Sequence, residues 1–129
     1  MRRVTYLAYL LVGIVMMSCS NDFGDADKRP SEVQVYDIHG KVEKGPFISG
    51  SDISIQPMDE NLQVLGSMFN TSIADNSGSF ALGSREFTTP YAEFMANGYF
   101  FNEVTGELSS GTITLRALVD LSNSTTVNV

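Results

Sequence analysis

The sequence predicts an all-β protein whose main part is a single antiparallel β-sandwich. Apolar residues recur at every second position in short runs from residue 33 onward, which is typical of half-buried strands. Clusters of Gly, Asn, Asp and Ser separate these runs, and no helical stripe is present after the N-terminal segment. Residues 33–129 are enough for one domain, so we expect one sandwich.

The first residues predict a targeting signal, residues 1–18, that takes no part in the fold. Arg2 and Arg3 form a basic start, and the apolar residues 4–17 carry no charge. This run is shorter than the about 20 residues that a membrane-spanning helix needs, which favours a cleaved signal peptide. Its end, Met16-Met17-Ser18-Cys19, resembles the lipobox of bacterial lipoproteins, although Met16 stands where Leu is usual.

The lipobox resemblance implies that Cys19 is the lipidation site. Its thiol would carry a diacylglycerol, and the signal would be cut just before it. Cys19 is the only cysteine of the chain, so a disulfide framework is excluded. Two or more acyl chains give stable anchoring to a membrane. The alternative is an ordinary secretory signal with an incidental cysteine.

Residues 19–32 are expected to form a flexible acidic tether, because they are polar and poor in apolar side chains. Asp22, Asp25 and Asp27 loosely resemble the surface-export signals of Bacteroidetes lipoproteins, and a plain solvated spacer is the alternative. Cleavage removes two of the 8 basic residues and none of the 15 acidic ones, which changes the net charge from −7 to −9. Such a chain repels nucleic acid and anionic lipid surfaces, so we expect the lipid alone to hold it at the membrane.

The strands are predicted one by one from apolar residues that share a face. In chain order these are Val33 with Val35, Ile38 with Val42 around Gly40, Ile53 with Ile55, Phe69 with Thr71 and Ile73, Phe80 with Leu82, Ala92 with Phe94 and Ala96, and Ile113 with Leu115, Ala117, Val119 and Leu121.

Turn residues predict how the strands are joined. Residues 75–78 (DNSG) are expected to close a hairpin between Ile73 and Phe80, and Asn97-Gly98 suits a tight type I′ hairpin turn. Thr105-Gly106 and residues 109–111 mark a further loop. The segment KGPFISGS, residues 44–51, leads into a strand pattern and not into a helix, so it predicts a connection between strands and not a phosphate-binding loop. Phe47 and Ile48 within it are expected to lie under the end of the sandwich.

A spaced series of these residues resembles a known family. Gly40-Lys41-Val42, Gly45-Pro46-Phe47, Gly50-Ser51, and Asp75 with Gly78 and Phe80 are similar to the carboxypeptidase-regulatory-like domains of the transthyretin-like (prealbumin-like) group. The resemblance implies a transthyretin-like or Ig-like antiparallel sandwich. Residues 96–106 and 115–121 are similar to a narrower set of Bacteroides-type lipoproteins. That set continues past the last residues here into a partly helical region, so the chain is either complete or C-terminally truncated. The zinc peptidase that accompanies the regulatory-like domains is absent from this sequence.

The sequence shows no recognisable catalytic or metal site. His39 is the only histidine and is expected to be an ordinary strand residue, while a zinc site needs three or four ligands. No nucleophile-elbow motif is present, and residues 73–78 do not match a calcium loop. We therefore expect neither cofactor nor metal.

The candidate ligand-stacking residues are Tyr99 and Phe101. In a strand they share one face and Phe100 takes the other, so an exposed ring could stack on a sugar or a partner. Core packing or pairing with Phe94 is the alternative.

Together these observations predict a lipid-anchored protein of the bacterial outer membrane, facing either the periplasm or the surface. We expect a non-catalytic structural or protein-interaction role. The alternative is a glycan-binding accessory lipoprotein in polysaccharide uptake.

Overall fold

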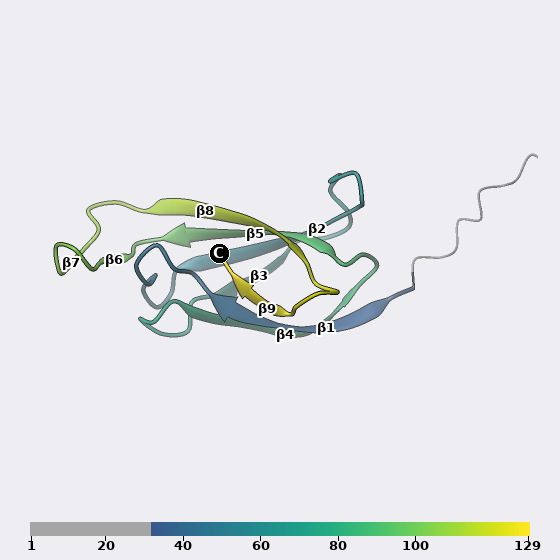
Figure 1. Cartoon of the computed structure of the whole chain (residues 1–129), viewed down its shortest axis with the longest axis horizontal. Helices are drawn as coiled ribbons and strands as arrows, with labels where there is room; N and C mark the ends of the chain where they lie inside the picture. The colour runs from purple at the N-terminus through teal and green to yellow at the C-terminus, as the bar shows by residue number, and fades with distance from the viewer. Residues whose placement is uncertain (1–31) are drawn as a thin grey trace, which may run out of the picture.

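The computed structural model describes residues 32–129, and these residues form an all-β sandwich, as the sequence predicts (Figure 1). One sheet has four strands in the order β3-β2-β5-β8, and the facing sheet has three in the order β4-β1-β9. A small two-stranded ribbon, β6-β7, extends from one end. The strands are β1 (Gln34–Lys41), β2 (Asp52–Met58), β3 (Phe69–Ser72), β4 (Ser79–Phe87), β5 (Tyr91–Gly98), β6 (Phe101–Asn102), β7 (Glu107–Leu108), β8 (Ile113–Asp120) and β9 (Thr126–Asn128).

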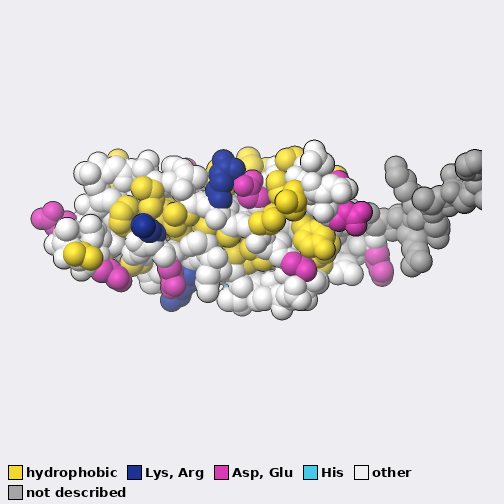
Figure 2. Space-filling view, turned by 45° about the horizontal axis from the view of Figure 1, so that its top comes forward, with side chains coloured by type: hydrophobic (Ala, Val, Ile, Leu, Met, Phe, Trp, Pro, Cys, Tyr) yellow, Lys and Arg dark blue, Asp and Glu magenta, His cyan; other side chains and the backbone are white. Residues whose placement is uncertain are grey.

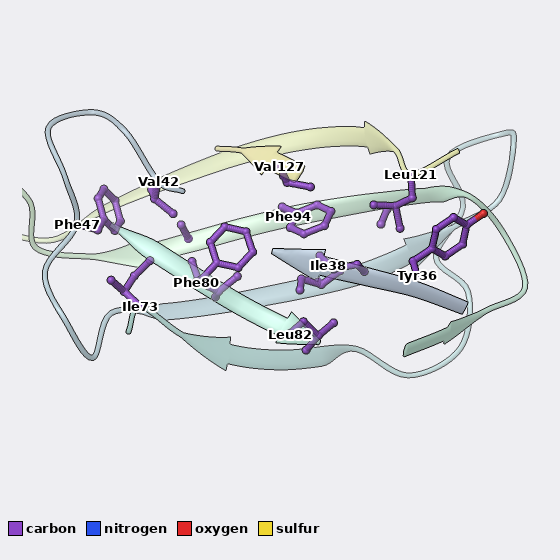
Figure 3. Packing of buried hydrophobic residues seen from close by; sticks show 14 of the residues in the cluster. Tyr36, Ile38, Val42, Phe47, Ile73, Phe80, Leu82, Phe94, Leu121 and Val127 are labelled. Carbon is purple, nitrogen blue, oxygen red and sulfur yellow. The ribbon is translucent and has the colours of Figure 1, made fainter. Parts of the chain in front are cut away.

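The inner faces of the two sheets form one core, and the period-two pattern determines which side chains enter it (Figure 3). Phe94 on β5 is fully buried, and its ring centroid lies 6.2 Å from that of Phe80 on β4 in the opposite sheet. Ile53 and Ile55 on β2 are buried in the same layer. These segments confirm the faces that the sequence assigns to β2, β4 and β5.

The first strand confirms the predicted pair Ile38 and Val42, which are both buried, but not the predicted pair Val33 and Val35. Val35 is 65% exposed, whereas Tyr36 and Ile38 face the core. Alternation at period two is compatible with either face, and here the larger Tyr36 ring is buried and contacts Phe87 edge-on at 5.9 Å. The pairing of β1 with β4 shifts register between Ile38 and His39, because β4 bulges beside Gly83, whose φ is 72°.

Four connections carry the chain between the sheets, and two of them use turn residues that the sequence marks. Residues 42–51, which include KGPFISGS, lead from β1 to β2 in the other sheet, and Phe47 is fully buried. The turn at residues 75–78 leads from β3 to β4. Ile73 and Phe80 pair across it as predicted, but the strands that continue from them belong to different sheets, so the turn forms a corner and not an ordinary hairpin.

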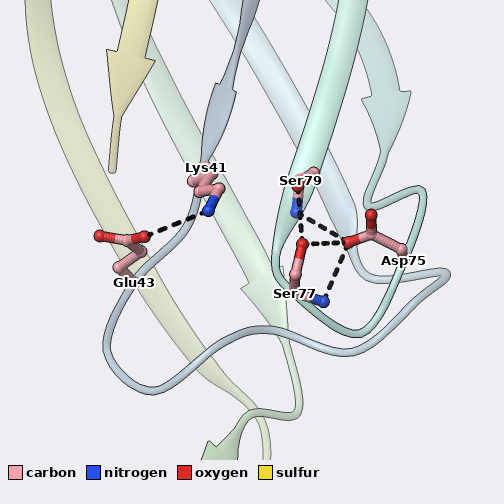
Figure 4. Close-up of polar contacts among 5 residues, drawn as sticks. All are labelled: Lys41, Glu43, Asp75, Ser77 and Ser79. Carbon is pink, nitrogen blue, oxygen red and sulfur yellow. Dashed lines mark hydrogen bonds and ion pairs between the residues drawn. The ribbon is translucent and has the colours of Figure 1, made fainter.

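The carboxylate of Asp75 organises this corner (Figure 4). Its Oδ1 accepts hydrogen bonds from the Ser77 amide at 2.9 Å, the Ser77 hydroxyl at 2.6 Å and the Ser79 amide at 3.3 Å. These bonds favour the charged form and lower the pKa of Asp75, with the Ser77 hydroxyl as the largest cause. Gly78 completes the turn with a φ of 76°, and a Cβ there would lie 2.5 Å from the carbonyl oxygen of Val42.

The lowered pKa of Asp75 predicts a pH dependence of stability. A carboxyl whose folded-state pKa lies below its unfolded value of about 3.9 stabilises the fold above that value, and the contribution is lost as the pH falls through the folded pKa. Asp75→Asn should therefore lose less stability than the unchanged chain as the pH is lowered from about 5 to 2. Urea unfolding across this range measures the difference, with Glu60→Gln, an exposed carboxylate in the β2–β3 loop, as the control. An equal loss of stability in Asp75→Asn and in the unchanged chain over this pH range would contradict the prediction.

Two further features differ from the sequence predictions. Asn97 and Gly98 do not form a type I′ turn. They are the last residues of β5, paired with Thr114 and Ile113 of β8, because the ladder continues and Gly98 permits close contact with the Ser51 side chain. The last strand, β9, pairs with β1 in parallel, so the sandwich is not antiparallel throughout.

Candidate functional site

The candidate site lies at the end of the sandwich where the chain leaves β5. Residues 99–101 run beside residues 46–48 of the β1–β2 connection. The Ile48 amide donates to the Tyr99 carbonyl at 3.1 Å, and the Phe101 amide donates to the Pro46 carbonyl at 2.9 Å. The KGPFISGS segment therefore supports the aromatic run as an adjacent strand would.

The three aromatic side chains alternate as the sequence predicts for an extended segment. Phe100 is partly buried and stacks on Phe47, with ring centroids 6.5 Å apart and planes at 26°. Tyr99 and Phe101 remain 42% and 41% exposed. Phe94 lies in the core, where its ring contacts that of Phe80, and the two candidate stacking rings are at the surface.

The β6–β7 ribbon extends this exposed surface outward (Figure 1). Asn102 closes its turn, because its Oδ1 accepts the Val104 amide at 3.0 Å and its carbonyl accepts the Gly106 amide at 2.8 Å. Gly106 has a φ of 71°, which suits glycine. Val104 at the tip is 95% exposed, and Leu108, paired with Phe101, is 51% exposed.

We call Tyr99, Phe101, Val104 and Leu108 the apolar tip. The alternating pattern of the sequence does not single out Val104 and Leu108, although an apolar residue between the turn residues Asn102 and Gly106 is a signal for the first of them. Glu103 and Glu107 are exposed on the same ribbon. In the space-filling view this end shows apolar atoms flanked by acidic ones (Figure 2).

A cleft adjoins Tyr99. Its volume is about 220 Å³, and its lining carries hydroxyl, amide and carboxylate groups beside the aromatic ring. The lining residues are Ile48, Ser49, Gly50, Ser51, Asp52, Asn97, Gly98, Tyr99 and Thr112. An exposed ring next to such groups is suited to a polyhydroxylated ligand, since the ring can stack while the polar groups accept and donate hydrogen bonds.

The remaining chemical candidates are His39, the acidic residues and Cys19. His39 is an exposed residue of β1, and its Nε2 lies 3.1 Å from the Thr126 hydroxyl. Within residues 32–129, no group of three or more His, Cys, Asp or Glu side chains is placed to hold a metal ion. Cys19, the predicted lipidation site, lies outside the described residues, as do the predicted signal peptide and most of the predicted tether.

Comparisons with known proteins add no relative: the chain matches no protein-family model, no curated protein and no solved structure. The part of the chain that the structure describes contains no helix able to span a bilayer.

Proposed function

We propose that this protein is a lipid-anchored β-sandwich of the bacterial outer membrane that binds another protein through the apolar tip and performs no reaction itself. The observation that carries the proposal is the exposure of four large apolar side chains on one projecting ribbon and the segment leading to it. Exposed apolar side chains that gather at one place are typical of interaction surfaces. The supported backbone of residues 99–101 would present them with little ordering cost.

Site-specific cross-linking tests the proposed protein partner. A photoreactive residue at Val104 should give one discrete adduct in intact envelopes, because its side chain is 95% exposed at the tip. The control places the same residue at Val64, which is 63% exposed on the β2–β3 loop. The adduct should vanish with Phe101→Ala and persist with Leu62→Ala. Equal labelling at both positions would contradict the proposal.

The proposed anchor rests on the lipobox resemblance and on Cys19. With Cys19→Ala the chain should keep its signal peptide, carry no lipid and leave the membrane fraction after mild washing, because no acyl chain remains. Metabolic labelling with a fatty-acid analogue, together with the mass of the protein, measures both effects. Ser18→Ala, which keeps a small residue before the cysteine, is the control. Normal processing and membrane partition of Cys19→Ala would contradict the anchor.

A second candidate function is glycan binding, and the cleft beside Tyr99 favours it. Retention on an immobilised polysaccharide should be lost with Tyr99→Ala and kept with Tyr99→Phe, because stacking needs the ring and not the hydroxyl. Val104→Ala should leave retention unchanged, since Val104 is not part of the cleft lining. Absence of retention across a broad glycan panel would count against this function.

A further inference from the structure

The two main sheets have four edges among the described residues, and one of them differs from the rest. The edge strands β3 and β9 contain only four and three residues. The edge strand β4 is longer but bulges at Gly83 and carries Arg85 and Glu86. Short edges, bulges and charges are the usual means by which edge strands avoid pairing with other chains. The edge strand β8 also carries two charges, Arg116 and Asp120, but it has eight residues, no Gly or Pro, and an unshifted register with β5.

The hydrogen-bonding pattern shows which backbone groups of β8 point to its free edge. The Leu121 amide donates to the Pro90 carbonyl at 2.8 Å, in line with the register that pairs Tyr91 with Asp120. Hydrogen-bonded and non-hydrogen-bonded pairs alternate along an antiparallel ladder. The odd-numbered residues of β8 therefore bond to β5, and the N–H and C=O groups of residues 114, 116, 118 and 120 point away from the sheet.

The side chains of β8 are also less covered than those of its neighbour. Leu115, Ala117 and Val119 face the core but remain half-buried, whereas the inward side chains of β5 are fully buried. The facing sheet ends in the three-residue β9, so it covers this side of the sandwich incompletely. Leu118 on the outer face is 54% exposed. Figure 2 shows apolar side chains between charged ones on the face that carries β8. A strand added at the free edge of β8 would cover both the half-buried inward side chains and the exposed Leu118.

We propose that the added strand is β8 of a second copy of this chain, paired antiparallel about a two-fold axis at Ala117. A two-fold axis perpendicular to the sheet keeps inner faces together, so inward residues must pair with inward residues. Of the two central registers that satisfy this condition, one places Arg116 opposite the second copy's Arg116, and like charges directly opposite are destabilising. The other places Ala117 on the axis.

The register centred on Ala117 makes β8 self-complementary. Leu115 lies opposite Val119, Thr114 lies opposite Asp120, and the methylenes of Arg116 cover the exposed Leu118. The guanidinium of Arg116, which already binds Glu93 at 2.9 Å, becomes a diagonal neighbour of the second copy's Asp120 on one side and of its Arg116 on the other. The outward-pointing backbone groups of the two strands would form about six hydrogen bonds, because the Asp120 carbonyl already accepts the Asn123 amide at 3.2 Å. This pairing leaves the apolar tip free, so it does not depend on the proposed function.

Disulfide trapping of the full chain in bacterial envelopes tests the pairing. Ala117→Cys places two thiols on the axis in a non-hydrogen-bonded pair, where Cα atoms lie about 4.5 Å apart, within disulfide range. After mild oxidation most of this variant should migrate as a covalent dimer. Ala81→Cys, an equal change at an exposed position of the bulged edge β4, should stay at the level of the unchanged chain. Equal trapping at both positions, or an adduct of Ala117→Cys with a different protein, would overturn the proposal.

A pair of charge variants at Leu118 tests the register and does not require a new thiol. Leu118→Glu faces the second copy's Arg116 and should tighten the dimer, while Leu118→Lys should weaken it, each by roughly three- to tenfold in Kd. Net charge alone predicts the opposite order, because the chain is acidic, with a formal charge of −7 before the predicted cleavage and −9 after it, and added acid increases repulsion. Sedimentation equilibrium of the mature chain in detergent measures both constants. A monomer at all concentrations, or a tighter dimer for Leu118→Lys than for Leu118→Glu, would overturn the proposal.

Discussion

Phe94→Ala is expected to lower the free energy of unfolding by about 3–5 kcal/mol, the usual cost of removing a large aromatic side chain from a core. Phe94 is fully buried at the centre of β5, the strand that pairs with both β2 and β8. Its ring meets Phe80 of the facing sheet, so the substitution opens a cavity between the two layers. Rigid ladders on both sides of β5 limit how far the cavity can collapse, which favours the upper part of this range.

Urea denaturation followed by far-ultraviolet circular dichroism measures the change. The matched control is Phe101→Ala, the same chemical change at a ring that is 41% exposed on β6, which should cost roughly 1 kcal/mol in proportion to its smaller buried area. Equal losses for the two variants would contradict the position of Phe94 at the centre of a shared core.

Gly40→Ala is expected to detach β9 and to lower the free energy of unfolding by about 2–4 kcal/mol. A Cβ at Gly40 would overlap the carbonyl oxygen of Val127, a backbone atom that cannot rotate away. Three hydrogen bonds around this contact hold the C-terminal segment: Val129 to Lys41 at 3.0 Å, Glu43 to Val129 at 3.2 Å and His39 to Thr125 at 3.2 Å. Displacement of β9 would also expose the buried Val127.

Hydrogen exchange distinguishes local detachment from a general loss of stability. In Gly40→Ala the amides of Val127 and Val129 should exchange much faster, while those of β2 and β5 should change little under native conditions. Gly111→Ala is the control, because a Cβ there meets no atom within 4 Å. Unchanged protection of β9 in Gly40→Ala would contradict the close contact between the two strands.

The sequence was sufficient for the strands whose pattern is local. Ile53 with Ile55, and Ala92 with Phe94 and Ala96, alternate with polar residues, and each set is buried as predicted. The pattern was not sufficient for β1, where apolar residues occur on both faces and only packing against Phe87 shows that Tyr36 is buried. Asn97-Gly98 was misassigned because a favourable turn pair was overridden by the ladder to β8.

The candidate site also has one part that a local sequence pattern predicts and one part that it does not. The alternation of Tyr99, Phe100 and Phe101 could be predicted, because it depends only on an extended backbone. The cleft could not, because its lining combines residues 48–52 with Asn97 and Thr112, which are far apart in the chain. Its formation depends on contacts across the end of the sandwich that no local pattern encodes. The parallel pairing of β9 with β1 is non-local in the same way.

The position of β1 at the centre of its sheet has a consequence for the order in which the protein folds. In the other sheet β3 follows β2 and β8 follows β5 at short range, while β2 and β5 pair over a separation similar to that between β1 and β4. The two neighbours of β1 are β4 and the last strand of the described chain. Long-range pairing carries a loop-closure cost and slows folding. We therefore expect the pairing of β9 with β1 to form last during refolding. An unfinished chain would keep one edge of β1 unpaired until β9 arrives, which makes it a natural client for a holding chaperone.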